Sequence, residues 1–317
     1  MKTVSVVMCT FNGAKYIREQ LDSILAQTYP ISEFIIQDDG STDDTVAIVK
    51  EYADKYPIIS FRTNTGERGV NGNFFSAIKL AKSDYIAISD QDDIWHPQKI
   101  EKQILSIGDN LLCSHRDNYI SEDGCFIHND TRKRNVSLLR LLFVCIPGHS
   151  FLFSKELLSM MPEQHPIYKG RCYDVAIQLA AAACDRIMFL DEDLVNFRRH
   201  SHALTYANSQ DTVPSAKNAW HILITCIKQY RKAKKKSYVY FDNVQDYIQN
   251  IHDENYVRNE AILICKLEKQ SGLIPFIRLQ YHFMKNANRL FHTPGYSFVK
   301  IFRAFLYPVM QLYKFTK

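Results

Sequence analysis

Residues 4–13 read Val-Ser-Val-Val-Met-Cys-Thr-Phe-Asn-Gly, a short apolar run that ends in a polar turn. A continuous apolar run of this length, bounded by turn residues, is typical of a strand that is buried on both faces of a sheet. After the turn, the apolar residues Ile17, Leu21, Ile24 and Leu25 recur at helical spacing. The stretch therefore predicts a strand, a loop and a helix.

The same alternation continues toward residue 93. Apolar runs at 34–36, 58–61 and 85–89 are separated by helical patterns near 46–56 and 72–81. Strands separated by helices form a largely parallel sheet, because each crossover helix returns the chain to the same edge. We expect an α/β domain with a Rossmann-like, mostly parallel sheet flanked by helices.

Polar loops follow three of these expected strands, at residues 10–13, 38–41 and 90–93. Ligands of such sheets bind beyond the carboxyl ends of the strands, so the three loops should converge on one crevice. The chain has no Gly-x-Gly-x-x-Gly segment and no P-loop lysine motif where a dinucleotide or triphosphate site would need it. A dinucleotide-dependent dehydrogenase is therefore disfavoured.

Asp90 and Asp92 are separated by one residue where the fourth expected strand ends. Their hard oxygen atoms suit Mg²⁺ or Mn²⁺ that carries phosphate oxygens. A turn followed by a helix N-cap explains the same residues, and it also explains the acidic segment 38–43. Neither motif decides the function alone.

Taken together and in this order, residues 6–12, 35–43 and 89–95 resemble the inverting family 2 glycosyltransferases of the GT-A fold. The Asp-Gln-Asp-Asp-x-Trp form at 90–95 is most similar to the rhamnosyltransferase-like branch that builds bacterial surface polysaccharides. The resemblance covers about residues 3–205. It implies transfer of a sugar from a UDP- or dTDP-sugar, with dTDP-rhamnose as one candidate, to a glycan or lipid-linked glycan acceptor.

The resemblance also implies roles for the loop residues. Asp90, with Gln91 beside it, would contact the sugar or ribose, and Asp92 would bind Mg²⁺ or Mn²⁺ on the diphosphate. Five residues of the first two loops would hold the nucleobase and ribose: Thr10, Phe11, Asn12, Asp38 and Asp39. Carboxylates accept hydrogen bonds from a pyrimidine N–H and from ribose hydroxyls, and an aromatic ring can stack on a base.

Asp174 matches the family's general base, just before an Ala-rich segment that reaches about Cys184. From the residues alone, a carboxylate in a first helical turn that is stabilised by the helix dipole is the favoured explanation, and the resemblance reverses that order. Tyr173 stands where the family often has His. Farther on, the resemblance places Arg198 at the diphosphate and His200 in the metal shell. A cluster of Arg and His side chains on the protein surface is the alternative explanation of this segment. The segment 148–151 resembles the lining of the acceptor cleft, and a turn followed by a strand is the alternative.

The last third of the chain has a different character. Residues 215–317 hold 17 Lys or Arg against 6 Asp or Glu, whereas residues 1–214 hold 22 against 28. We expect a catalytic domain at 1–207, a junction at 208–215, and a basic, aromatic helical extension at 208–317. Cationic amphipathic helices too short to span suit the surface of an anionic membrane. The alternative is an extension that packs on the catalytic domain, and nucleic-acid binding ranks third because no recognised motif is present.

Composition limits the remaining possibilities. With 317 residues, 46% hydrophobic and 23% charged, the chain is an ordinary globular protein. Its eight cysteines are scattered, and its first residues lack the pattern of a signal peptide, so we expect a cytoplasmic protein that is peripheral at the cytosolic membrane face. Two rival functions stay open at this point: a metal-dependent nucleotidyltransferase, and a catalytically silent GT-A scaffold.

Overall fold

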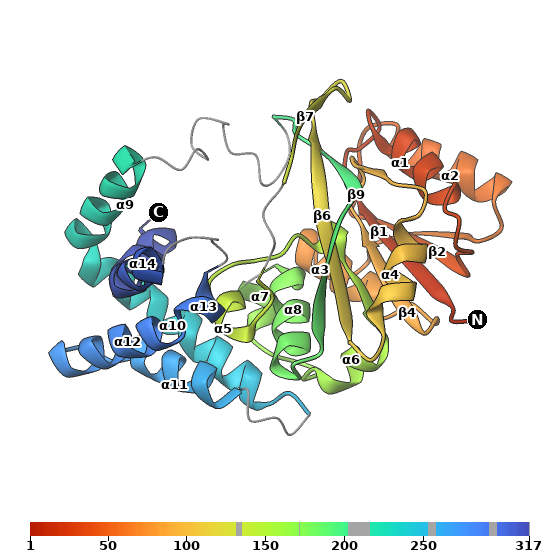
Figure 1. The fold of residues 1–317 in the computed structure, drawn as a ribbon. Coiled ribbons are helices and arrows are strands. Elements are labelled where there is room, and N and C mark those ends of the chain that lie inside the picture. Colours follow the sequence, from red (N-terminus) through yellow and green to blue (C-terminus); the bar gives the residue numbers. More distant parts are fainter. Residues whose placement is uncertain (131–134, 171, 202–215, 253–257, 292–296, 317) are drawn as a thin grey trace. The chain divides into compact units, whose positions relative to one another are not determined.

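A computed structural model describes residues 1–130, 135–170, 172–201, 216–252, 258–291 and 297–316 (Figure 1). The described residues form two compact units. Unit 1 lies within residues 1–133, 145–181 and 186–203, and unit 2 lies within residues 134–144, 182–185 and 204–317. The junction expected at 208–215, with its boundary after residue 207, falls outside the described residues.

One half of the sheet in unit 1 is the predicted parallel unit. Strand β1 pairs in parallel with β2 on one side and with β4 on the other, and β3 extends the sheet beyond β2. Three helices alternate with these strands along the chain, as the apolar spacing predicted. The elements are β1 (Val4–Thr10), α1 (Ile17–Leu25), β2 (Glu33–Asp38), α2 (Thr45–Lys55), β3 (Ile59–Thr63), α3 (Val70–Ile78) and β4 (Tyr85–Ser89).

The other half of the sheet is mixed. The strand order is β3-β2-β1-β4-β8-β6-β9-β5, with β7 paired on β6. Strand β8 runs antiparallel to both β4 and β6, whereas β6 and β9 are parallel neighbours (Figure 1). The elements are β5 (Ile94–Trp95), α4 (Lys99–Ile107), β6 (Leu112–Ile120), β7 (Phe126–Asn129), η1 (Gly148–Ser150), β8 (Leu152–Ser154), α6 (Glu156–Met160), α7 (Ile167–Gly170), α8 (Tyr173–Ala183) and β9 (Ile187–Arg198).

The register of these antiparallel strands decides what lies beside the end of β4. Ala87 of β4 pairs with Leu152 of β8, and Cys113 of β6 pairs with the same Leu152. Because β8 runs the opposite way, the residues before Leu152 lie beside the residues after Ala87. The segment 148–151 is thereby brought to the carboxyl end of β4, where the acidic loop 90–93 begins.

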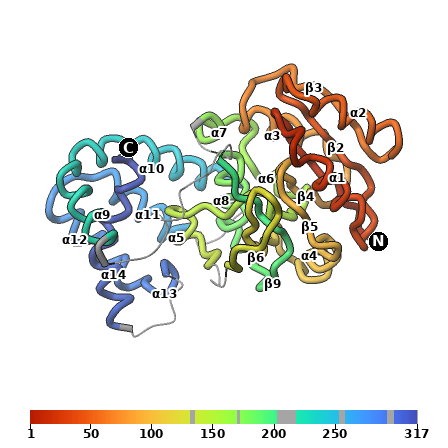
Figure 2. Tube along the Cα trace, turned by 90° about the horizontal axis from the view of Figure 1, so that it is seen from above, coloured from red at the N-terminus to blue at the C-terminus, as the bar shows by residue number. Residues whose placement is uncertain are grey.

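Unit 2 is helical, as expected for the last third of the chain. Helix α10 packs on α11, and α14 contacts both α12 and α9 (Figure 2). None of the helices in the described ranges has the length and apolar content that a bilayer-spanning helix needs. The elements are α5 (Leu138–Leu141), α9 (Ala216–Lys228), α10 (Tyr230–Gln249), α11 (Arg258–Lys269), α12 (Leu273–Lys285), α13 (Ala287–Leu290), α14 (Ser297–Met310) and η3 (Gln311–Phe315).

Unit 2 has a buried core of its own. The interior includes an ionic contact in which the Lys234 ammonium lies 2.9 Å from the Glu268 carboxylate, and Gln311 donates to the same carboxylate at 3.0 Å. Around it lie fully buried apolar side chains of four helices: Phe241, Val244, Tyr247, Ile264, Cys265, Phe283 and Ala304.

Candidate active site

The loops after β1 and β4 are held together by a reciprocal amide contact. The Gln91 side chain accepts from the Phe11 backbone N–H at 2.9 Å and donates to the Phe11 carbonyl at 3.0 Å. Gly13 makes room for this contact, because a Cβ atom there would lie 2.3 Å from the Gln91 Oε1 atom. Gln91 and the Phe11 backbone therefore fix the two loops to each other.

The loops after β1 and β2 are linked in the same way. The Asn12 backbone N–H donates to the Ser41 hydroxyl at 2.8 Å, and the Thr42 N–H donates to Asn12 Oδ1 at 2.8 Å. Asp38 is buried and accepts from the Thr10 hydroxyl at 2.8 Å and from the Ser41 N–H at 2.8 Å. The buried Thr10 and Asp38 side chains thus stabilise the turn. The Asn12 backbone adopts a φ of 49°.

Five of the predicted nucleotide-binding residues are accessible on these loops, among them the exposed Asn12 and the half-buried Gln91. The Phe11 ring is 55% exposed, and Asp39 and Asp90 are half-buried. The two carboxylates share one environment: burial raises the pKa of the Cys9 thiol well above its usual value, and the charges of Asp90 and Asp39 raise it further. The first, second and fourth strands therefore bring their polar loops together, as the topology predicted.

The predicted metal ligands lie next to each other. His200 Nε2 is 2.8 Å from Asp92 Oδ2, and His200 is 6% exposed. The other ring nitrogen of His200 is buried without a hydrogen-bond partner. The contact is a hydrogen bond between the imidazole and the carboxylate. Two ligands of one octahedral Mg²⁺ or Mn²⁺ also stand about 3 Å apart when each metal bond is about 2.1 Å, so the separation is compatible with a shared ion.

Arg198 holds the acidic loop at residues 90–93 in place. Its side chain is 2% exposed, and its guanidinium donates to the Asp92 carbonyl at 2.9 Å and to the Glu122 carbonyl at 2.8 Å. The guanidinium also pairs with the Glu19 carboxylate, and the Arg198 backbone N–H donates to Asp93 Oδ1 at 3.0 Å. These contacts fix the loop backbone, and the predicted contact of Arg198 with a diphosphate stays a prediction.

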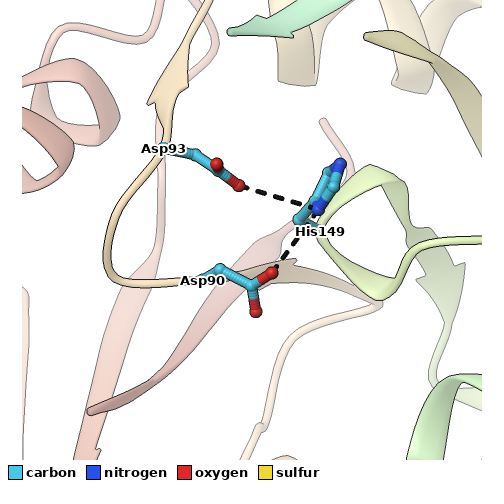
Figure 3. Close-up of side chains that lie close together, drawn as sticks. All are labelled: Asp90, Asp93 and His149. Carbon is cyan, nitrogen blue, oxygen red and sulfur yellow. Dashed lines mark ion pairs between the residues drawn. The ribbon is translucent and has the colours of Figure 1, made fainter. Parts of the chain in front are cut away.

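A second cluster of possible ligands consists of Asp90, Asp93 and His149 (Figure 3). His149 Nδ1 is 3.4 Å from Asp90 Oδ2 and 3.6 Å from Asp93 Oδ2, and one ligand atom from each residue lies within 4.8 Å of the others. The opposite ring nitrogen, Nε2, lies 3.2 Å from Asp117 Oδ1. His149, Asp93 and Asp117 are all buried, and Asp93 Oδ2 has no hydrogen-bond partner.

The charge of this cluster can be balanced in two ways. Burial lowers the pKa of His149, but the charges of Asp117 and Asp93 outweigh burial and raise the pKa well above its usual value. Burial raises the pKa of the Asp93 carboxyl, and the His149 charge opposes that rise. Either a protonated His149 pairs with these carboxylates, or a neutral His149 that donates to Asp117 shares one divalent cation with Asp90 and Asp93.

The sequence did not single out Asp93, His149 or Asp117 as site residues. They come from three segments whose proximity depends on the pairing of β4, β8 and β6. The only sequence signal was the resemblance of 148–151 to an acceptor-side segment, and it named no partner for the imidazole.

Asp174, the predicted base, lies in the first turn of α8 and is half-buried. One carboxylate oxygen accepts from the Val175 N–H at 2.7 Å. Burial raises the pKa of Asp174 to about 6, a hydrogen bond from Cys145 opposes the rise, and the charges of Asp90 and His149 act on it as well. Asp174 therefore lies within electrostatic range of the Asp90 and His149 side chains.

Tyr173, the residue before Asp174, is buried. Its ring stacks on Phe74 with 4.1 Å between the centroids, and its backbone N–H donates to Asn71 Oδ1 at 2.9 Å. The Tyr173 ring leaves no room for a side chain at residue 148, because a Cβ atom there would lie 2.2 Å from the Tyr173 hydroxyl.

Comparison with known proteins agrees with this geometry. The family model described as glycosyl transferase family 2 matches residues 5–160. An uncharacterized protein of Mycobacterium tuberculosis is 31% identical over 222 residues, which cover 66% of this chain and 62% of that protein. An uncharacterized glycosyltransferase of Rickettsia typhi is 37% identical over 165 residues, which cover 49% of this chain and 51% of the relative.

The chain thus spans less than two thirds of the length of these curated relatives. Among solved structures, residues 1–349 of TarS from S. aureus in complex with UDP-GlcNAc match 96% of this chain and 90% of that chain, with a TM-score of 0.55 and 17% identity. A likeness at this identity concerns the fold, and it includes the helical part of the chain. Through the domain at residues 5–160, the chain belongs to glycosyltransferase family 2 and has the GT-A fold.

Proposed function

We propose that the chain is a metal-dependent, inverting glycosyltransferase that moves a sugar from a nucleoside diphosphate sugar to a hydroxyl group of a glycan or lipid-linked glycan. One observation supports the proposal most: burial raises the pKa of the Asp174 carboxyl to about 6, and the charge of Asp90 acts on that carboxyl. A general base with a pKa near the working pH is effective because it is ionised and still accepts a proton readily.

The donor would bind at the crevice formed by the loops after β1, β2 and β4. Phe11 offers an exposed ring for a nucleobase, and Asp39 and Asp90 offer carboxylates for N–H and hydroxyl groups. Thr10, Asn12, Asp38 and Gln91 would act by holding these loops in place. We propose a UDP- or dTDP-sugar, with dTDP-rhamnose favoured by the Asp-Gln-Asp-Asp-Ile-Trp segment at 90–95.

Asp92 and His200 would hold Mg²⁺ or Mn²⁺, and their 2.8 Å separation fits two neighbouring ligands. The bound ion would neutralise the charge of the diphosphate leaving group. Asp174 would accept the proton of the acceptor hydroxyl while that oxygen attacks C1 of the sugar from the face opposite the diphosphate. The bond from C1 to the diphosphate oxygen breaks as the new bond forms, so the configuration at C1 inverts.

We further propose that residues 1–207 form the transferase domain and that the helical residues 208–317 associate with an anionic membrane surface. In that arrangement the enzyme would act at the cytosolic face of the membrane in bacterial surface polysaccharide synthesis. Lipid-linked acceptors reside in such a membrane, so attachment would raise their local concentration at the site.

A thermal-shift panel tests the proposed donor class. The protein is heated with UDP, dTDP, GDP and ADP, each with and without Mn²⁺, because a ligand that binds only the folded state raises its stability. We expect a metal-dependent rise with one pyrimidine diphosphate. Absence of a shift with every nucleotide would instead favour a catalytically silent scaffold.

The metal ligands are tested in the same assay with two variants. Asp92→Ala should lose the Mn²⁺-dependent part of the shift and keep the fold, because the Asp92 side chain is near the surface, with 19% exposed. If Asp93→Asn loses the metal dependence while Asp92→Ala keeps it, the ion belongs to the Asp90, Asp93 and His149 cluster. Far-UV circular dichroism checks that each variant is folded.

A further inference from the structure

Three helices of unit 2 carry large apolar side chains on their outer surface. The exposed fraction reaches 64% for Trp220 on α9, 73% for Ile274 on α12 and 77% for Phe298 on α14. Single exposed apolar residues are common on soluble proteins, but a concentration of them marks an interaction site. The exposed apolar residues of these helices are Trp220, Ile224, Ile227, Leu273, Ile274, Ile277, Tyr281, Phe298, Val299, Ile301, Phe302 and Phe305.

These residues are not needed for the core of unit 2. Each of the three helices buries other side chains: Cys226 on α9, Leu279 and Phe283 on α12, and Ala304 on α14. The helices also pack on one another, since α14 contacts both α9 and α12 (Figure 2). The exposed apolar residues therefore form a second set, on helices whose inner sides are already packed.

Exposed cations lie one helical turn after members of this apolar set. Four pairs have the spacing i, i+4, which places both side chains on the same side of a helix. The pairs are Ile224 with Lys228, Ile274 with Arg278, Tyr281 with Lys285, and Val299 with Arg303. Helices α9, α12 and α14 contain no Asp or Glu, so no acidic side chain on them offsets these charges.

We propose that the exposed sides of α9, α12 and α14 form a docking surface for an anionic lipid bilayer, the "lipid-docking surface". Apolar side chains of such helices enter the acyl boundary, while the long stems of Lys and Arg let their charges reach the phosphates. The absence of acids on these helices gives the surface charge complementarity to anionic headgroups. Two copies that met through this same surface would instead bring like charges together, which disfavours a symmetric dimer through it.

This proposal specifies the membrane partner and does not depend on transferase activity, since lipid binding is measured without a donor. The chain itself supplies the reporter. It has two tryptophans, of which Trp95 is 2% exposed and Trp220 is 64% exposed. A change of tryptophan emission on lipid binding therefore reports on Trp220 in the docking surface.

The experiment titrates the full chain with vesicles of phosphatidylcholine alone and of phosphatidylcholine with about one third phosphatidylglycerol. We expect a blue shift of tryptophan emission, and quenching by brominated lipid, with the anionic vesicles. The triple variant Lys228→Gln, Arg278→Gln, Arg303→Gln should bind about a hundredfold more weakly, at about fivefold for each cation. Its control is Lys50→Gln, Lys55→Gln, Lys79→Gln, which removes the same charge from exposed lysines of unit 1 and should bind as the parent does.

A second pair of variants tests the apolar part. Ile274→Asp should abolish the blue shift, whereas Leu105→Asp should not, although Leu105 in unit 1 is 79% exposed. Equal loss in both aspartate variants, or no blue shift with anionic vesicles, would overturn the proposal. A blue shift that depends on protein concentration without vesicles, together with a dimer in analytical ultracentrifugation, would assign the surface to a second copy and also overturn it.

Discussion

The pKa of Asp174, raised to about 6, suits the proposed general base. Replacing it by Asn keeps the shape of the side chain but removes the site that accepts the proton. We expect Asp174→Asn to lower kcat by about 10² to 10⁴, the usual size of a general-base contribution, with the affinity for the nucleoside diphosphate unchanged. Steady-state kinetics and calorimetric titration measure the two quantities.

The matched control is Asp185→Asn, which changes an exposed carboxylate at a residue with a φ of 55° that Asn tolerates. It should leave kcat within the error of the assay. A turnover number in Asp174→Asn equal to that of the parent would remove Asp174 from the mechanism.

The pH dependence of the reaction follows from the raised pKa of Asp174. A base works only when it is deprotonated, so kcat/KM should rise with pH through about 6 and then level off. The hydrogen bond from Cys145 stabilises the carboxylate, so Cys145→Ala should move this rise to higher pH. Cys125→Ala, in an exposed turn, should leave the profile in place, and an identical profile for the Cys145 and Cys125 variants would show that the limb belongs to another group.

At the scale of single residues, the sequence pointed to the acidic loops after β2 and β4 but not to the buried carboxylates Asp93 and Asp117 around His149. Asp92 and His200 are adjacent, although 108 residues separate them in the chain, and the family resemblance had paired them. Arg198 is predicted to contact a diphosphate, and the contacts of its guanidinium with two backbone carbonyls and with Glu19 were not foreseen. Side-chain partners of this kind depend on the packing of β5, β6 and β9, which no local pattern encodes.

At the scale of elements, Gly148 decides how closely η1 approaches α8. We expect Gly148→Ala to lower the free energy of unfolding by about 1–3 kcal/mol, because its Cβ would overlap the buried Tyr173 ring and the core would be overpacked. The rate of sugar transfer should also fall, because Tyr173 directly precedes Asp174, the proposed base. Denaturant unfolding gives the first quantity and initial rates give the second.

Gly66→Ala is the matched control for this substitution. A Cβ atom at residue 66 would meet only Asn64 Oδ1, at an ordinary distance of 3.5 Å. Its stability should stay within about 0.5 kcal/mol of the parent. Equal effects of the two substitutions would mean that loss of glycine, and not the Tyr173 contact, is responsible.

The elements themselves were largely predictable. The pattern of the apolar residues located β1 to β4 and the helices between them, because β1, β2 and β4 are buried on both faces and the helices have one buried side. The antiparallel additions β8, β6 and β5 were not predicted, since they are short or pair with strands distant in sequence. The His149 cluster was missed for the same reason: it exists only when β8 lies between β4 and β6.

At the scale of the whole molecule, the proposed donor-binding loops lie in unit 1 and the helices of the proposed lipid-docking surface lie in unit 2. Two functions on separate units should respond to separate substitutions. We expect Asp92→Ala to abolish metal-dependent nucleotide binding without changing vesicle affinity, and Ile274→Asp to do the reverse. Parallel thermal-shift and vesicle titrations check both, and loss of both activities in either variant would contradict the separation.

The reciprocal contact between Gln91 and Phe11 has a consequence for the speed of donor capture. Because the protein's own atoms tie the loops together, we expect an incoming nucleotide to meet a formed receptor, with little chain order created on binding. Association should then follow a single exponential whose rate constant rises linearly with nucleotide concentration, without the plateau that a slow rearrangement imposes. Gln91→Ala would loosen the receptor and introduce that plateau.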